Sequence, residues 1–188
     1  MSNKKFPRIY SLSTVGIRNH YNSDYRFHPF RTDFAGDSGV GKSIIADVLQ
    51  LILVGEREFK SATDSSSERE ARKLIIERYG YVFLNIAIDT DKFIVIGMYI
   101  STTSIDPFII QANIGLDVFE PLSSPLISKD FMSGDEIIDI TNLPERMKEN
   151  KQAYAAKLSL NKYHELLEQN KILPIDLKTE GNLKNFAQ

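Results

Sequence analysis

Cysteine is absent from the 188 residues of this chain. Its absence excludes disulfide bonds, thiolate zinc sites and a cysteine nucleophile, and it suits a reducing cytoplasm. Long apolar runs are missing too, because the longest, Phe93–Ile100, is far too short to span a bilayer. The polar, basic start Met1–Arg8 is not followed by an apolar run, so it does not have the pattern of a signal peptide. We expect a soluble cytoplasmic protein with no membrane partner.

An excess of positive charge is also lacking, since the formal net charge is −2. No overall field therefore indicates nucleic acid, although a local patch can be hidden in the sum. The N-terminal segment is locally basic, through Lys4, Lys5, Arg8, Arg18, Arg26 and Arg31. These side chains either line a groove for phosphate or DNA or are scattered, solvated charges, and the second interpretation is the simpler one.

A metal-ligand pattern is the third absence. The three histidines, His20, His28 and His164, stand far apart in the sequence and have no ligand spacing. We therefore interpret them as surface or turn residues.

Apolar periodicity predicts one domain that contains both helices and strands. A stripe at helical spacing predicts a helix over Lys42–Val54, which Gly55 closes. Two β-branched and aromatic runs, Tyr81–Ile88 and Phe93–Ser101, surround a polar turn and predict a hairpin covered on both faces. Further strands are predicted at Ile9–Val15, Asp24–Phe27, Arg31–Ala35 and Phe108–Ile114, and further helices at Ser67–Arg78, Pro144–Leu158, Asn161–Asn170 and Asn182–Gln188.

We assign residues 1–188 to a single lobe. Residues 1–55 hold the first strands and the first helix, residues 56–120 form a β-hairpin subdomain, and residues 121–188 are mostly helical. Because the last predicted helix runs to the end of the sequence, we expect this chain to be part of a longer protein.

The segment Gly36–Ser43 matches the complete Walker A pattern of a phosphate-binding loop. Its glycines let backbone N–H groups approach phosphate oxygens, and the following helix adds the positive end of its dipole. Lys42 would place its ammonium between the β- and γ-phosphates, and Ser43 would be a magnesium ligand. A chance match is the alternative, but the strand before and the helix after favour a true site. The expected ligands are ATP and Mg²⁺, and the expected contact residues are Gly36, Asp37, Ser38, Gly39, Val40, Gly41, Lys42, Ser43 and Ile44.

A catalytic carboxylate is harder to identify. Asp89 follows an apolar strand, as the magnesium-site aspartate of a phosphate-loop enzyme does. However, the next strand begins only four residues later, and a parallel crossover needs about ten or more. We therefore interpret Asp89 as a hairpin-turn residue, and we assign no catalytic residue with certainty.

The order of these parts resembles the N-terminal half of an SMC-type ATPase head, within the ABC-like ATPases. The nearest resemblance is to the MukB-like and Wadjet JetC-like branch. The stretches that carry it are Thr32–Ala35 with Gly36–Ser43 and Asp47–Leu53, then Phe59–Ala62 with Gly80–Val82, and finally Tyr163–Leu167, Ile172–Pro174 and Leu183–Phe186.

This resemblance implies an α/β fold, namely a P-loop NTPase lobe with an antiparallel β-subdomain around the Walker A helix. It implies an ATPase that acts on DNA in chromosome maintenance, repair or antiviral defence. A coiled coil and a C-terminal head lobe would complete the head, and a second head would sandwich ATP, with kleisin-like subunits as further partners. The family roles carry over to Gly36, Gly39, Gly41, Lys42 and Ser43. The chain departs from the family at Ser38, where asparagine is common, and it lacks a glutamine near Ile172–Ile175.

Without the C-terminal lobe, we expect this chain to bind nucleotide weakly and to hydrolyse it poorly. Two alternatives stay open. One is a complete small P-loop kinase or NTPase that uses Asp89, which requires a parallel sheet with Asp89 close to Ser43. The other is a nucleotide-sensing module that docks a partner without hydrolysis.

Overall fold

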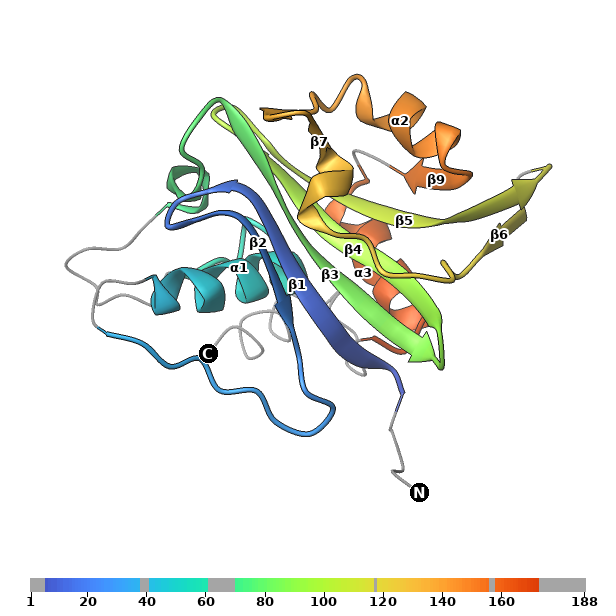
Figure 1. Ribbon diagram of the computed structural model, residues 1–188, viewed down its shortest axis with the longest axis horizontal. Helices are drawn as coiled ribbons and strands as arrows, with labels where there is room; N and C mark the ends of the chain where they lie inside the picture. Colours follow the sequence, from blue (N-terminus) through green and yellow to red (C-terminus); the bar gives the residue numbers. More distant parts are fainter. Residues whose placement is uncertain (1–5, 38–40, 61–69, 117, 156–157, 173–188) are drawn as a thin grey trace.

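A computed structural model describes residues 6–37, 41–60, 70–116, 118–155 and 158–172. Within them, seven strands form one sheet (Figure 1). Six of them follow the order β2-β1-β3-β4-β5-β6, in which β4 and β6 pair with successive parts of one edge of β5. The seventh strand, β9, pairs with the opposite edge of β5. Its strands are β1 (Arg8–Ile17), β2 (His20–Arg26), β3 (Tyr79–Asp89), β4 (Lys92–Ser101), β5 (Ile105–Gly115), β6 (Val118–Glu120) and β9 (Gln152–Ala155). A separate small ribbon joins β7 (Met132–Ser133) to β8 (Glu136–Ile137).

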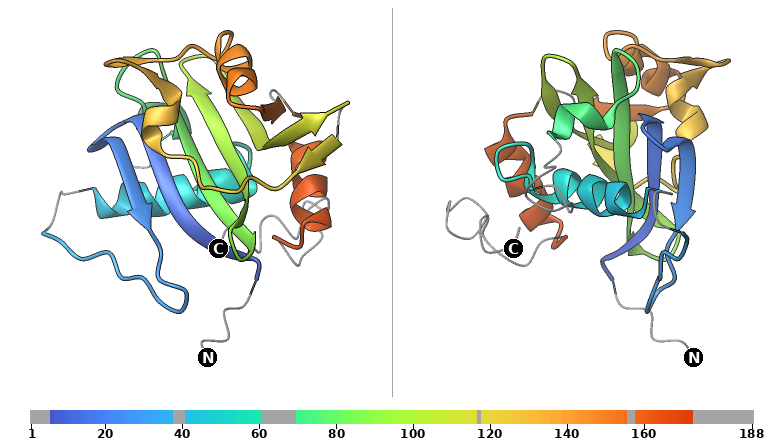
Figure 2. Two further views of the ribbon diagram at one scale, coloured as in Figure 1. Left: turned by 45° about the vertical axis from the view of Figure 1, so that its right-hand side comes forward. Right: turned by 90° about the vertical axis from the view of Figure 1, so that its left-hand side faces the viewer.

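Helical segments cover the two faces of this sheet. One face carries α1 (Lys42–Val54) and α3 (Leu160–Gln169), and the other carries the short η3 turn (Ser128–Phe131) and the β7–β8 ribbon (Figure 2). The remaining α-helix, α2 (Leu143–Glu149), contributes to the core on the η3 face. None of the described helices has the length and apolar content needed to cross a bilayer.

The expected α/β class is wrong for this chain. Every strand pair in the described sheet is antiparallel, and the described residues form a mainly antiparallel β-structure with short helices. The connections explain this result. β1 and β2, and likewise β3 and β4, are joined by two-residue turns, and such a turn can only reverse the chain direction.

Several individual elements are confirmed. Helix α1 has the predicted bounds Lys42–Val54, and the backbone N–H of Gly55 donates to the Leu51 carbonyl oxygen at 2.9 Å. The β3–β4 hairpin turns between Asp89 and Lys92, as predicted. β1, β5 and α3 correspond to the predicted strands at Ile9–Val15 and Phe108–Ile114 and the predicted helix at Asn161–Asn170.

Other predicted elements are wrong because tertiary partners decide them. Arg31–Ala35 is not a strand, since its backbone joins no ladder. In the described part of the predicted helix 67–78, a 3₁₀ turn (η2, Ala71–Leu74) is followed by Ile75, which bridges Ile17 of β1. The predicted helix Pro144–Leu158 ends at Glu149, and the chain then adds β9 to the edge of β5. Residues 67–69 and 182–188 lie outside the described residues.

The hairpin β3–β4 is buried on both faces, as the sequence predicts. Val82, Leu84 and Ile86 face α1, whereas Tyr81 and Phe83 face η3. This alternation is the two-residue period of a strand, with apolar side chains in both phases. On the η3 face Phe131 stacks on Phe83 with ring centroids 4.5 Å apart.

Close approach also fixes the residue at position 97 of β4. A Cβ atom there would lie 2.5 Å from the carbonyl oxygen of Val82 and 2.5 Å from the ring of Phe108. Only glycine leaves room for both neighbours, so Gly97 lets the sheet pack tightly at its centre.

A polar clasp joins α3 to the end of α1. The Tyr163 hydroxyl donates to the Ile52 carbonyl oxygen at 2.8 Å, and His164 Nε2 donates to that of Leu53 at 3.1 Å. These acceptors belong to the last turn of α1, whose carbonyls have no partner within the helix. Burial raises the pKa of Tyr163 well above its ordinary value and lowers the pKa of His164, while the bond to Leu53 opposes the lowering.

The lowered pKa of His164 makes stability depend on pH. Because the unfolded chain takes up this proton first, the contribution is present above the unfolded pKa of about 6.5 and is lost as pH falls below it. A tenfold difference in proton affinity between the folded and unfolded chain corresponds to about 1.4 kcal/mol. We expect the free energy of unfolding in denaturant titrations to fall more between neutral and mildly acidic pH for the parent than for His164→Gln, which keeps an N–H donor. Equal losses in the two proteins would contradict this assignment.

Candidate phosphate-binding site

The segment between β2 and α1 carries the chain back to the helix start. The Phe27 N–H donates to the Tyr10 carbonyl oxygen at 2.8 Å, which holds the beginning of the segment against β1. Phe34 then packs edge-on against both Tyr25 and Phe27, with ring centroids 5.8 Å apart in each pair. These aromatic contacts position Gly36 without any strand pairing.

Helix α1 begins at a glycine with a left-handed backbone. Gly41 has φ +94°, a conformation that other residues rarely adopt, and its carbonyl accepts the N–H of Ile44 at 2.9 Å. No side chain of the described residues caps the helix, and its first turn contains no acidic residue. The partial positive charge of the helix N-terminus is therefore not neutralised by a carboxylate in its own first turn.

The Lys42 side chain connects the two ends of the loop. Its Nζ donates a short hydrogen bond to the carbonyl oxygen of Gly36, the first residue of the Walker A pattern. The ammonium therefore spans the two ends of the loop, while its side chain stays exposed. Ser43 is half-buried in the first turn, next to Ile44. Asp37 is exposed, and Ser38, Gly39 and Val40 lie outside the described residues.

His20 supports this loop from the neighbouring strand, a role that the sequence did not indicate. His20 Nε2 lies 3.0 Å from the Gly41 carbonyl oxygen, and Nδ1 contacts the Tyr25 hydroxyl. A carbonyl can only accept, so Nε2 carries the proton and, in the neutral ring, Nδ1 accepts from Tyr25. The fit is close, since a Cβ on Gly41 would lie 2.6 Å from His20 Nε2.

The interpretation of the histidines as surface or turn residues is therefore wrong for two of them. His20 and His164 are buried and bond to backbone carbonyls at opposite ends of α1. A signal for His20 is absent from the sequence because it lies 21 positions from Gly41 and only the fold brings them together.

Asp89 lies far from the phosphate loop. It ends β3 at the hairpin turn, where its Oδ1 accepts the Thr90 N–H at 2.7 Å. Tyr81, near the other end of β3, pairs with Val15 at the end of β1 that leads to His20. The eight residue-to-residue steps from Tyr81 to Asp89 span about 26 Å of strand. The alternative that needs a parallel sheet with Asp89 beside Ser43 is therefore wrong.

Grouped metal ligands are also absent from the part of the chain that the structure describes. No three histidine or carboxylate side chains in it gather into a metal site.

No family model matches this chain, and no curated protein sequence matches it significantly.

We expect His20→Leu to loosen the first turn of α1. Losing one hydrogen bond costs about 0.5–1.5 kcal/mol, which corresponds to amide exchange about twofold to tenfold faster. Exchange measured by NMR should accelerate at Ile44 and Ile45, with Ile52 near the end of the helix as the internal control. His20→Gln, which can still donate to Gly41, should be closer to the parent. Uniform acceleration along α1 would indicate general destabilisation instead.

Proposed function

We propose that this chain binds a nucleoside triphosphate, with ATP as the expected ligand, through Gly36–Ser43 and the N-terminus of α1. The observation that carries this proposal is the Lys42 ammonium held across the loop, at a helix start without acidic side chain or cap. Phosphate oxygens would replace the Gly36 carbonyl as the partner of Lys42 and would accept N–H groups of the first turn.

Ser43 is the proposed magnesium ligand, because its hydroxyl follows Lys42 in the first turn of the helix. When bound, the metal ion neutralises charge between the β- and γ-phosphates. His20 and Gly41 contribute by fixing where the helix begins, so that the N–H groups point toward the ligand.

We further propose that the chain is the ATP-binding lobe of a larger SMC-like ATPase that acts on DNA. The support is the Walker A motif together with the three stretches of resemblance. No carboxylate cluster for a metal ion exists among the described residues, and Asp89 is remote. Hydrolysis would then need groups from a C-terminal lobe and a second head, with kleisin-like subunits as further partners.

Lys42→Ala should weaken binding of Mg·ATP. Charge-assisted hydrogen bonds contribute about 1.5–3 kcal/mol, so we expect the dissociation constant to rise about tenfold to a hundredfold. Isothermal titration calorimetry with a non-hydrolysable analogue would measure it. Lys162→Ala removes an exposed lysine of α3 that pairs with Glu165, and it serves as the matched control. Equal affinity of the parent and Lys42→Ala would exclude the proposed site.

The isolated chain should bind Mg·ATP but turn it over slowly. Ordinary enzymes reach about 1 s⁻¹ or more, and we expect phosphate release well below that rate. A phosphate-release assay on the parent and on Lys42→Ala measures it. Ordinary turnover that depends on Lys42 would show that the active site is complete in this chain. Association induced by the analogue, seen by light scattering, would favour the nucleotide-sensing module.

A further inference from the structure

Two arginines meet at one corner of the sheet. Arg8 is the first residue of β1 and Arg26 is the last residue of β2, and the register pairs Ser11 with Arg26. Both guanidinium groups lie on the ring of Tyr10, with Cζ 5.5 Å from the ring centroid for Arg8 and 4.8 Å for Arg26. We call Arg8, Tyr10 and Arg26 the arginine clamp.

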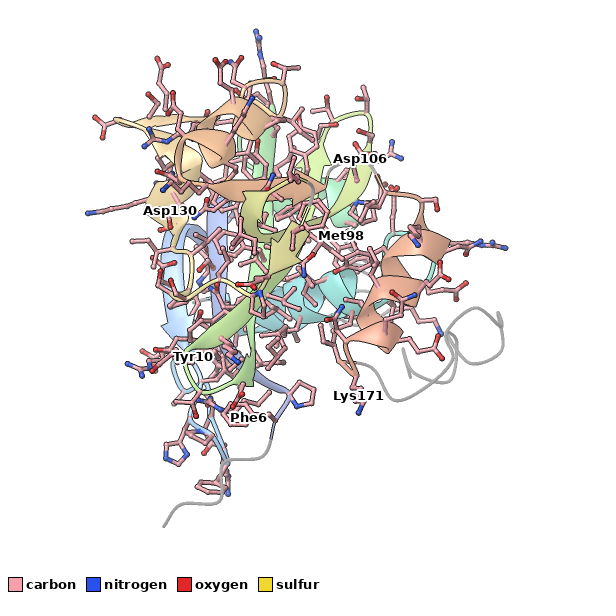
Figure 3. The ribbon with its side chains drawn as sticks, turned by 90° about the vertical axis from the view of Figure 1, so that its right-hand side faces the viewer. Phe6, Tyr10, Met98, Asp106, Asp130 and Lys171 are labelled. Atoms are coloured by element: carbon pink, nitrogen blue, oxygen red, sulfur yellow. The ribbon has the colours of Figure 1, made fainter. Side chains whose placement is uncertain are left out.

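The arginine clamp lies on the face of the sheet opposite α1. Tyr10 contacts Phe93 edge-on at 5.0 Å, and both belong to the core under η3. Tyr25 and Phe27, the neighbours of Arg26 in sequence, pack on the α1 side, so Arg26 points the other way. Figure 3 shows Tyr10 beside Phe6 at the end of the sheet, away from Asp130 of η3. The sheet therefore separates the clamp from the phosphate loop.

Within the described residues, no carboxylate balances the charges of the clamp. Neither guanidinium forms an ion pair with a described carboxylate. The nearest acid along β2, Asp24, already accepts hydrogen bonds from Ser13 and Ser128. Arg8 Nε and Nη1 are buried without any acceptor. Two like charges on one ring repel each other, and unpaired buried guanidinium nitrogens are costly, so an anion at this corner would stabilise it.

We propose that the arginine clamp binds the phosphodiester backbone of nucleic acid. Guanidinium groups match phosphate oxygens through planar, multiple N–H donors. The clamp is accessible to solvent, because Arg26 lies on an edge strand and keeps part of its surface exposed. A solvated ion pair between this arginine and a single small anion would be weak. A polymer adds many such contacts, which favours nucleic acid over free phosphate. The Tyr10 ring already holds both arginines and Phe93, so the contact should be independent of base sequence.

This inference deepens the DNA-handling part of the proposed function and rests on it only in the choice of DNA. It does not depend on nucleotide binding. The two proposals can therefore fail separately, because Lys42→Ala should bind DNA as the parent does and Arg26→Gln should bind Mg·ATP as the parent does.

The test is binding of the full chain to short labelled single-stranded and duplex DNA, followed by fluorescence anisotropy over a range of NaCl concentrations. One phosphate contact changes the logarithm of the DNA-binding constant by about 0.9 per decade of salt concentration. If Arg26→Gln loses one such contact, it should weaken DNA binding about eightfold at 0.1 M salt and reduce the salt slope by about 1. Arg26→Lys, which keeps the charge, should lose less. Arg146→Gln on α2 removes the same charge from an exposed arginine near Glu149 and should leave the salt slope unchanged.

Arg8→Gln is the second clamp variant, but Arg8 is partly buried, so Arg26→Gln carries the test if Arg8→Gln does not fold. Inorganic phosphate distinguishes the source of the anion, when it is compared with NaCl at equal ionic strength. Competition beyond the ionic-strength effect, with no loss of DNA binding in Arg26→Gln, would mean that the clamp takes free phosphate. Affinity and salt slope equal to the parent on both DNA forms would overturn the proposal.

Discussion

The β3–β4 hairpin must be covered on both of its faces, and the rest of the structure follows from that requirement. Its side chains are apolar in both phases of the strand period, so neither face can remain in water. Helix α1 covers one face, and η3 with its neighbours covers the other. Asn85, a buried polar residue of β3, bonds to Ser11 and to both backbone groups of Leu126, and thereby ties the second layer to the sheet.

Covering the first face with α1 also places the helix N-terminus beside the β1–β2 turn. There His20 contacts Gly41, so a strand residue supports the proposed nucleotide loop. The same strand, β2, ends at Arg26 in the arginine clamp. β2 therefore contacts both proposed ligand sites, although they lie on opposite faces of the sheet.

The elements that the sequence predicted well are those whose signals are local. Apolar residues at helical spacing and a closing glycine define α1, and two β-branched runs around a polar turn define the hairpin. The failures occur where a distant partner decides. Ile75 lies in a charged stretch that was predicted to be helical, but it forms a β-bridge with Ile17. Gln152–Ala155 was also predicted to be helical, but it pairs with β5 as a strand. Arg31–Ala35 has the composition of a strand but finds no partner strand.

The sequence by itself determined the Walker A pattern, the helix that follows it and the two-sided apolar hairpin, because each depends on residues close together along the chain. Only the tertiary structure decided that β1 pairs with β3 and β9 with β5, that His20 supports Gly41 and that Arg8 and Arg26 share one tyrosine ring. These features join residues that are far apart in sequence. Their contact energies exist only after the chain has folded, so no local pattern encodes them.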